Sequence, residues 1–418
     1  MASPARTKSF KVLEYSFLGD LRNLKRLVAE FGGDGKGIAR IKDKKGLSAL
    51  HLAAGEGKLN VVKYLIQDLK FHVDLKSGNG DTPLHHASQG GHLSTAVYLL
   101  GKDANPDARN DLQYTPLHHA AYNGDTDFVL LLLSKGVNVD VTCEFGTPLN
   151  RAAGQGKPEV VKILLEHRAN PNIFFNRVFT PLSSSIIGQS LACLELLIEG
   201  GADPNAGSCG FTPLLQAVDD DEKEMIQSLL KAGADPNMTN ELGLTPIEVA
   251  AMKGNLEVVE ILYPRTTPIA TYLDWSIDGI LTQINSEEAE EQRALKRMQV
   301  FGEMKMKGQE AFGEKDYLTA IFWYSKALEL SVNPILLSNR SLCWARLKDG
   351  ERCLEDAQTC VMLAPDWPKA HYREGVAWML YEKFDEAANA FAKGLELEPE
   401  NKELKKALQL SCTLNCYM

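Results

Sequence analysis

Apolar side chains over the first two thirds of the chain recur in short helical stretches that return with a fixed period. Each period holds a first apolar stretch after a Ser or Thr and then a second one, such as VVKYLI at 61–66. The Ser/Thr position recurs seven times, 32 to 34 residues apart: Ser48, Thr82, Thr115, Thr147, Thr180, Thr212 and Thr245. Thr before Pro is typical of a helix N-cap with Pro at the first helical position. The pattern therefore predicts seven pairs of short helices.

Helix pairs this short cannot each bury an apolar face alone, so we expect neighbouring pairs to stack into a solenoid. Their motifs, among them DTPLHHASQGG and YTPLHHAAYNG, resemble those of the ankyrin repeat family. The resemblance covers residues 9–264 and includes a degenerate unit at 12–30, which we interpret as an N-terminal cap. It implies an all-helical stack of a cap and seven repeats that binds other proteins.

The histidines of these motifs, His51, His85 and His118, invite interpretation as ligands. The equivalent position of the later repeats changes residue type: Asn150, Ser183, Leu215 and Glu248. No shared metal site or active site would tolerate this drift. In the ankyrin family the motif histidine hydrogen-bonds between neighbouring units, so we expect a structural role here.

The turns between the repeats form a second region of interest, because solenoid proteins often bind through one face of their loops. Glycine stands two residues before the Ser/Thr in four turns, where the backbone favours a positive φ: Gly46, Gly80, Gly210 and Gly243. Gln113 and Val178 replace that glycine in two middle turns, and the fourth unit lacks a residue there. The middle turns therefore depart from the pattern.

The loop NIFFNRVFTP at 172–181 brings aromatic side chains next to one of these unusual turns. Aromatic residues on a loop can anchor a partner, or they can pack onto neighbouring turns. We expect Phe179 to pack, and we leave both alternatives open for Phe174 and Phe175. The predicted partner surface of the ankyrin repeats comprises Gln113, Phe174, Phe175, Arg177 and Val178.

A connector and a second period follow the ankyrin-like repeats. Residues 265–295 contain a Pro- and Thr-rich connector, which we expect to cap the stack, and the start of a long helix predicted at 286–312. Three units then recur with offsets of 33 and 34, and each carries two small residues 12 apart: Gly308 and Ala320, Ser341 and Cys353, Gly375 and Ala387. Small residues at these places would let the two helices of a unit approach closely.

This second period resembles the tetratricopeptide repeat (TPR) family, as three repeats and a solvating helix over residues 296–411. The predicted fold class is therefore all-α, with two helical solenoids in tandem. The segments LLSNRS and PDWPKAHYR look much like those of a co-chaperone subgroup that carries a two-carboxylate clamp. The clamp positions fall on the first, third and fifth helices of the region: Lys305, Gln309, Asn339, Lys369 and Arg373. Four of the five match by type, and Gln309 stands where the subgroup has Asn.

The resemblance implies a peptide partner, the C-terminal Glu-Glu-Val-Asp of cytosolic heat-shock chaperones of the 70- or 90-kilodalton class. By resemblance, Lys305 and Asn339 would hold the terminal carboxylate, Lys369 the Asp side chain, and Arg373 the peptide upstream. Converging cations suit a terminal Asp, which presents two carboxylates for charge-assisted hydrogen bonds. The extra methylene of Gln309 would displace its amide, and one imperfect neutral hydrogen bond costs on the order of 1 kcal/mol.

Composition narrows the function classes further. The formal net charge of −10 argues against nucleic acid or an anionic membrane as the main partner, and the longest apolar stretches are too short to span a bilayer. The eight cysteines show no zinc spacing, and we expect reduced thiols in a protein of the cytoplasm or nucleus. We also expect no signal peptide, no metal and no cofactor.

Two functions remain open from the sequence. The first is an adaptor or co-chaperone, in which the TPR groove binds a chaperone tail and the ankyrin stack binds a client. The second is an ankyrin scaffold whose TPR region serves self-association or other protein contacts, with a vestigial clamp. An enzyme is the weakest class, because the chain has no nucleophile elbow, P-loop, HExxH, kinase or dinucleotide motif.

Overall fold

The computed structural model describes residues 4–32, 35–175, 178–207 and 210–416, and within them every regular element is a helix. The chain divides into two compact units, Met1–Asn240 with Leu244–Pro268, and Glu241–Gly243 with Ile269–Met418. The predicted all-α fold with two helical solenoids is confirmed. Each unit is described by itself.

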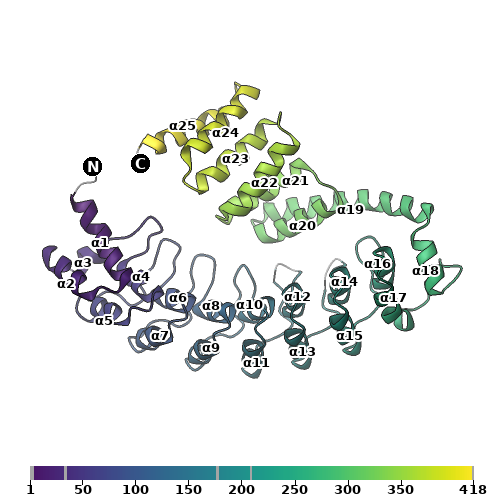
Figure 1. Ribbon diagram of the computed structural model, residues 1–418, viewed down its shortest axis with the longest axis horizontal. Helices are drawn as coiled ribbons and strands as arrows, with labels where there is room; N and C mark the ends of the chain where they lie inside the picture. Colours follow the sequence, from purple (N-terminus) through teal and green to yellow (C-terminus); the bar gives the residue numbers. More distant parts are fainter. Residues whose placement is uncertain (1–3, 33–34, 176–177, 208–209, 417–418) are drawn as a thin grey trace. The chain divides into compact units, whose positions relative to one another are not determined.

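The first unit begins with three helices, α1 (Pro4–Leu18), α2 (Leu21–Glu30) and α3 (Gly35–Ala39), and continues with seven helix pairs. The first helices of the pairs are α4 (Ala49–Gly55), α6 (Pro83–Gln89), α8 (Pro116–Asn123), α10 (Pro148–Gly154), α12 (Pro181–Ile187), α14 (Pro213–Asp219) and α16 (Pro246–Met252). The second helices are α5 (Leu59–Gln67), α7 (Leu93–Leu100), α9 (Thr126–Leu133), α11 (Pro158–Glu166), α13 (Leu191–Glu199), α15 (Lys223–Lys231) and α17 (Leu256–Leu262), followed by the short η1 (Tyr263–Arg265). Figure 1 shows the first helices in one row and the second helices in another.

The Ser/Thr positions found in the sequence are the N-caps of the first helices, and the motif histidines join each repeat to the next. His51 Nε2 lies 2.8 Å from the carbonyl of Leu75, and His118 Nε2 lies 3.2 Å from that of Gly146. In each ring Nδ1 accepts the backbone N–H of the N-cap, so the proton sits on Nε2 and is donated to the carbonyl. The predicted structural role of these histidines is confirmed.

A second ladder of hydrogen bonds connects the turns. In successive turns a side-chain oxygen accepts the backbone N–H of the next turn, as Asp74 does from Asn105 at 3.1 Å and Asn172 does from Asp203 at 2.8 Å. The last rung is the bond from Thr267 N–H to Asn237 Oδ1, at 2.8 Å. The connector therefore begins as an extension of the stack.

The second unit holds eight helices within the described residues. They are α18 (Ile277–Ile284), α19 (Glu287–Gly313), α20 (Tyr317–Leu330), α21 (Pro334–Arg346), α22 (Gly350–Leu363), α23 (Pro368–Leu380), α24 (Phe384–Leu397) and α25 (Lys402–Cys416). The observed α19 differs by one residue at each end from the predicted range 286–312. The buried Arg293 of α19 donates to the carbonyl of Ile284 at 2.6 Å, which ties α18 to α19.

The small residues recognised in the sequence lie where paired helices touch. A Cβ atom at Gly308 would clash with the ring of Tyr324, and one at Gly375 would clash with the ring of Phe391. Ser341 Oγ donates to the carbonyl of Cys353 at 2.9 Å, so this pair also joins the two helices of its repeat. These contacts fix α19, α21 and α23, the three helices that carry the predicted clamp.

Candidate functional site

Three of the predicted clamp residues occupy equivalent positions of the repeat. Lys305, Asn339 and Arg373 are 34 residues apart in sequence, and they lie on α19, α21 and α23. Gln309 follows Lys305 by one helical turn, and Lys369 precedes Arg373 by one turn. Since residues four apart share a helix face, each pair points to the same side of its helix.

Arg373 is the most strongly held of these side chains. It is 8% exposed, its Nε donates to the carbonyl of Ser338 at 3.2 Å, and its guanidinium lies 5.6 Å from the ring centre of Tyr372. Burial lowers the pKa of Arg373 from its usual value, although an arginine stays charged in proteins. Within the described residues, no carboxylate forms an ion pair with it. Arg373 is thus a fixed, nearly buried cation without an ion-pair partner among the described residues, although the charge of Glu403 across the cavity acts on it.

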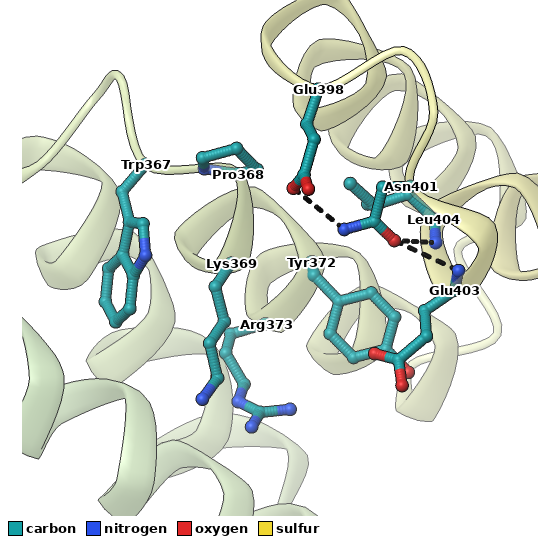
Figure 2. Close-up of a pocket in the computed structure, with 9 residues that line it drawn as sticks. All are labelled: Trp367, Pro368, Lys369, Tyr372, Arg373, Glu398, Asn401, Glu403 and Leu404. Carbon is teal, nitrogen blue, oxygen red and sulfur yellow. Dashed lines mark hydrogen bonds between the residues drawn. The ribbon is translucent and has the colours of Figure 1, made fainter.

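Lys369 and Arg373 line one cavity, of about 250 Å³, beside α23. Figure 2 shows the amine of Lys369 and the guanidinium of Arg373 close to each other, with the ring of Tyr372 next to them. Lys369 is exposed, whereas Arg373 is nearly buried. The two cations therefore present one exposed and one nearly buried positive charge to the same cavity.

Gln309 and Asn339 line a second cavity, of about 200 Å³, together with Phe312, Tyr324 and Leu342. Burial raises the pKa of the Tyr324 hydroxyl to about 12, while the nearby Asn339 side chain acts to lower it. Lys305 is half-buried one turn before Gln309 and lines neither cavity. The structure thus brings together Gln309 with Asn339 and Lys369 with Arg373.

The predicted partner surface on the ankyrin repeats is only partly a surface. Phe174 is 43% exposed, whereas Phe175 stacks on Phe179 with ring centres 5.2 Å apart. Val178 is only 5% exposed, so its inclusion in the surface was wrong: the side chain is buried. Arg177 lies outside the described residues.

Gln113, the fifth residue of that predicted surface, lies exposed on a different turn. Its φ of 62° is the left-handed conformation expected for the glycine that it replaces. Its side-chain oxygen accepts a hydrogen bond from Arg109 Nη1 at 3.4 Å. The conformation of Gln113 is therefore set by the turn, and its exposure leaves it available for a partner.

Sequence reasoning missed an arginine held among aromatic rings in the first unit. The guanidinium of Arg151 on α10 lies 4.4 Å from the ring centre of Tyr122, 5.5 Å from that of Phe145 and 5.7 Å from that of Tyr114. Its buried Nε has no hydrogen-bond partner, and no ion pair to an acid is present among the described residues. The signal in the sequence was Arg151 at the place that His86 and His119 take in earlier repeats.

Other kinds of site find no support in the part of the chain that the structure describes. No group of three or more His, Cys, Asp or Glu side chains is arranged to hold a metal ion. None of the described helices combines the length and the apolar character needed to cross a membrane.

Two family models match the chain. The model described as ankyrin repeats matches residues 15–110, 99–175, 117–208 and 184–271, which together exceed half of the chain. The model described as tetratricopeptide repeat matches residues 368–401, the segment that contains Lys369 and Arg373.

Curated relatives match a shorter stretch. Heat shock protein STI1 of Saccharomyces cerevisiae is 42% identical over 108 residues, 25% of this chain and 18% of the relative. Hsp70-Hsp90 organizing protein 2 of Arabidopsis thaliana is 41% identical over 103 residues, 24% of this chain and 18% of the relative. The chain thus spans under a fifth of the length of these two relatives.

Among solved structures, the ankyrin repeat domain of human ASB11 is similar to this chain. The match has a TM-score of 0.49 and 31% sequence identity, and it covers 54% of this chain and 100% of the ASB11 chain.

Proposed function

The chain belongs to the ankyrin repeat family and also carries tetratricopeptide repeats, two kinds of module that mediate contacts between proteins, and on this premise we propose that it is a non-catalytic adaptor of the co-chaperone type. Its TPR groove binds the C-terminal Glu-Glu-Val-Asp of a heat-shock chaperone of the 70- or 90-kilodalton class. Its ankyrin stack binds a client or another second protein. We place this activity in the cytoplasm or the nucleus.

The observation that carries the proposal is Arg373, a nearly buried cation that forms no ion pair among the described residues. Leaving a charge in this state is costly unless an anion completes it. A peptide carboxylate is such an anion, and Lys369 lines the same cavity. The similarity to Heat shock protein STI1 and to Hsp70-Hsp90 organizing protein 2 supports a chaperone tail as its source.

In this proposal the position of each clamp residue determines which part of the peptide it contacts. Lys305 and Asn339 bind the chain-terminal carboxylate, Lys369 binds the Asp side chain, and Arg373 contacts the peptide upstream. Gln309 shares the cavity of Asn339 and supplies a longer amide than the clamp subgroup has there. Binding is therefore retained but weakened by this amide.

The second partner of the adaptor binds the ankyrin stack. Exposed Phe174 and Gln113 remain proposed contacts, since both side chains reach solvent. Arg151 adds a third, because its cation lies among three aromatic rings without an ion pair in the described part of the chain. These residues suit a partner with apolar and acidic side chains.

The test is a titration of the full chain with a labelled peptide that ends in Met-Glu-Glu-Val-Asp, as the free acid and as the C-terminal amide. We expect micromolar binding that is lost on amidation and in Lys369→Ala, and retained in Lys393→Ala, which removes an exposed lysine of α24 outside the cavity. No binding of the free acid would overturn the chaperone-tail proposal. It would favour a scaffold whose TPR region self-associates, which sedimentation of the full chain would reveal.

A further inference from the structure

Helix α19 carries a stripe of exposed apolar side chains on the face opposite its buried one. Leu295, Met298 and Met306 are 70%, 75% and 68% exposed, whereas Val300 is buried. The spacing of the three exposed residues places them on one face of the helix. With 27 residues against 14, α19 also extends past α20, the helix on which it packs (Figure 1). The stripe is therefore open to solvent.

Gly302 lies in the middle of this stripe, and the packing of the second unit does not require a glycine there. Within the described residues a Cβ atom at Gly302 would meet no neighbouring atom within 4 Å, whereas one at Gly308 would clash with the ring of Tyr324. A glycine inside a helix weakens it relative to alanine. The bare backbone at Gly302 therefore suits a close approach from outside the chain.

Two charged side chains flank the stripe on one side without an ion pair of their own. Lys296 Nζ donates to Gln299 Oε1 at 3.5 Å, and Gln299 Nε2 donates to Glu303 Oε1 at 2.8 Å. In the part of the chain that the structure describes, neither Lys296 nor Glu303 forms an ion pair. Such a face favours a partner helix with an apolar stripe and the reverse order of the two charges.

A second copy of α19 has this order of charges when it runs antiparallel to the first. With a twofold axis near position 300, Met298 of each copy faces Gly302 of the other, since both lie two residues from the axis. Lys296 and Glu303 lie four and three residues from the axis, so each lysine meets the glutamate of the other copy. A parallel pair would instead bring each charge level with its own like.

We propose that this face of α19 binds a second copy of the chain in antiparallel orientation. Met298 fills the space over Gly302 of the other copy, and methionine adapts well to such a space. Each contact occurs twice because of the symmetry. The stripe spans about three helical turns, less than a standard interface of about 800 Å² per partner, so the dimer is weak, with a Kd of roughly 10 to 100 μM.

The same face also carries part of the proposed clamp. Gln309 is exposed on α19 three residues after Met306. Glu291 of the second copy would lie level with it, since both residues are nine positions from the axis. The second copy and the chaperone tail would therefore exclude one another. This consequence rests on the proposed function, whereas the dimer itself does not.

The experiment is sedimentation velocity of the full chain at about 5 to 200 μM, where we expect a reversible dimer. Met298→Glu should weaken association more than tenfold, because it places a charge in the apolar contact. Met362→Glu, which places the same charge at an exposed methionine of α22, should leave association unchanged. Gly302→Leu should weaken it about tenfold although leucine is the better helix former, so a loss of folding would not explain the effect.

An exchange of charges tests the antiparallel pairing. Lys296→Glu alone or Glu303→Lys alone sets like charges opposite each other at two places, so each should weaken the dimer about tenfold. An equimolar mixture of the two variants restores opposite charges at both places. The mixture should therefore associate about as tightly as the unchanged chain. A mixture that associates no better than either variant would overturn the antiparallel pairing.

The remaining outcomes separate the dimer from the clamp. An unchanged chain that stays monomeric at about 200 μM would overturn the dimer, and the peptide titration would still decide the clamp. Equal losses in Met298→Glu and Met362→Glu would show that the contact lies elsewhere. If no peptide binds, the clamp fails, and sedimentation still decides the dimer.

A final arm tests the overlap of the two sites. The free-acid peptide that ends in Met-Glu-Glu-Val-Asp should dissociate the dimer at saturation, and its C-terminal amide should not. A dimer that persists with the peptide bound would overturn the placement of the second copy over Gln309.

Discussion

Arg373 of α23 donates through Nε to the main-chain carbonyl of Ser338 on α21, at 3.2 Å. Ser338 directly precedes Asn339, so this bond ties the cation of one repeat to the neighbouring clamp position of another. The planar guanidinium can keep this bond and still present its two Nη groups to a ligand. The proposed clamp is thus held together by one of its own members.

This double role predicts a specific failure of a conservative substitution. Arg373→Lys keeps the charge, but an ammonium cannot bond the carbonyl and present a second donor fork, so we expect about tenfold weaker binding of the free-acid peptide. The measurement is a fluorescence titration of the full chain, with Lys369→Arg as the matched exchange at the exposed position. Unchanged affinity in Arg373→Lys would show that the peptide needs only the charge.

A substitution of Gln309 is expected to have the opposite effect, a gain of affinity for the peptide. It shares a cavity with Asn339, and its extra methylene moves the amide away from the place that the clamp subgroup fills with Asn. Gln309→Asn should therefore tighten binding by roughly fivefold, the equivalent of about 1 kcal/mol. Isothermal titration with the free-acid peptide checks this, and Gln358→Asn, at an exposed site of α22, serves as control. Equal or weaker binding would show that the longer side chain already reaches the ligand.

The sequence predicted the helical framework well because its determinants are local. Thr before Pro caps a helix whatever the neighbouring repeats contain, and a glycine such as Gly375 marks a close approach by its size alone. The role of the motif histidines could be predicted in the same way, since His51, His85 and His118 make equivalent bonds in three successive repeats. Repetition along the chain made these features visible without a structure.

Features that depend on contacts between different repeats were not visible in the sequence. Lys369 and Arg373 share a helix face, yet only Arg373 is nearly buried, because the backbone of α21 packs over it. Val178 stands in an unusual turn, yet its side chain is buried. The rings around Arg151 come from separate places in the chain, so nothing in their spacing indicates that they meet. Which side chains become buried, and which ones meet, depends on how the repeats stack. The sequence alone does not show that packing.

The helix that carries Asn339 is itself held by a buried ion pair. Arg340 donates to both oxygens of Asp356 on α22, at 2.8 and 2.6 Å, and also to Ser325 Oγ on α20, at 2.9 Å. Asp356 is only 4% exposed, so removing its partner leaves an uncompensated buried charge. Arg340→Met should therefore lower the free energy of unfolding by about 3 to 5 kcal/mol.

Urea unfolding followed by tryptophan fluorescence measures this loss, since all five tryptophans lie between residues 275 and 378, within the second unit. The double variant Arg340→Met with Asp356→Leu removes both charges and should recover most of the stability. Peptide affinity should follow the same order, because α21 positions Asn339. A double variant no more stable than Arg340→Met would contradict the account of Asp356 as a stranded charge.

The repeat histidines predict how the first unit responds to acid. Burial lowers the pKa of His51 and of His118 to about 4, and it also lowers the pKa of His85. An unfolded histidine titrates near 6.5, so between about pH 6.5 and pH 4 the unfolded chain binds protons that the folded chain does not. Stability is therefore full above this window and falls as the pH drops through it, by about 3 kcal/mol at its lower end for His51 and for His118.

The next repeat shows which residue can replace a motif histidine in a test of this acid sensitivity. At the equivalent position of the next repeat, Asn150 Oδ1 accepts the N-cap backbone N–H at 3.0 Å and its Nδ2 donates to Ser184 Oγ at 3.4 Å, without a titratable group. His118→Asn should thus flatten the decline of the first unit's melting temperature between pH 7 and pH 4.5, followed by circular dichroism with tryptophan fluorescence as a separate report on the second unit. His167→Asn, at an exposed ring, should leave the decline unchanged. An equally steep decline in His118→Asn would show that other groups cause the acid sensitivity.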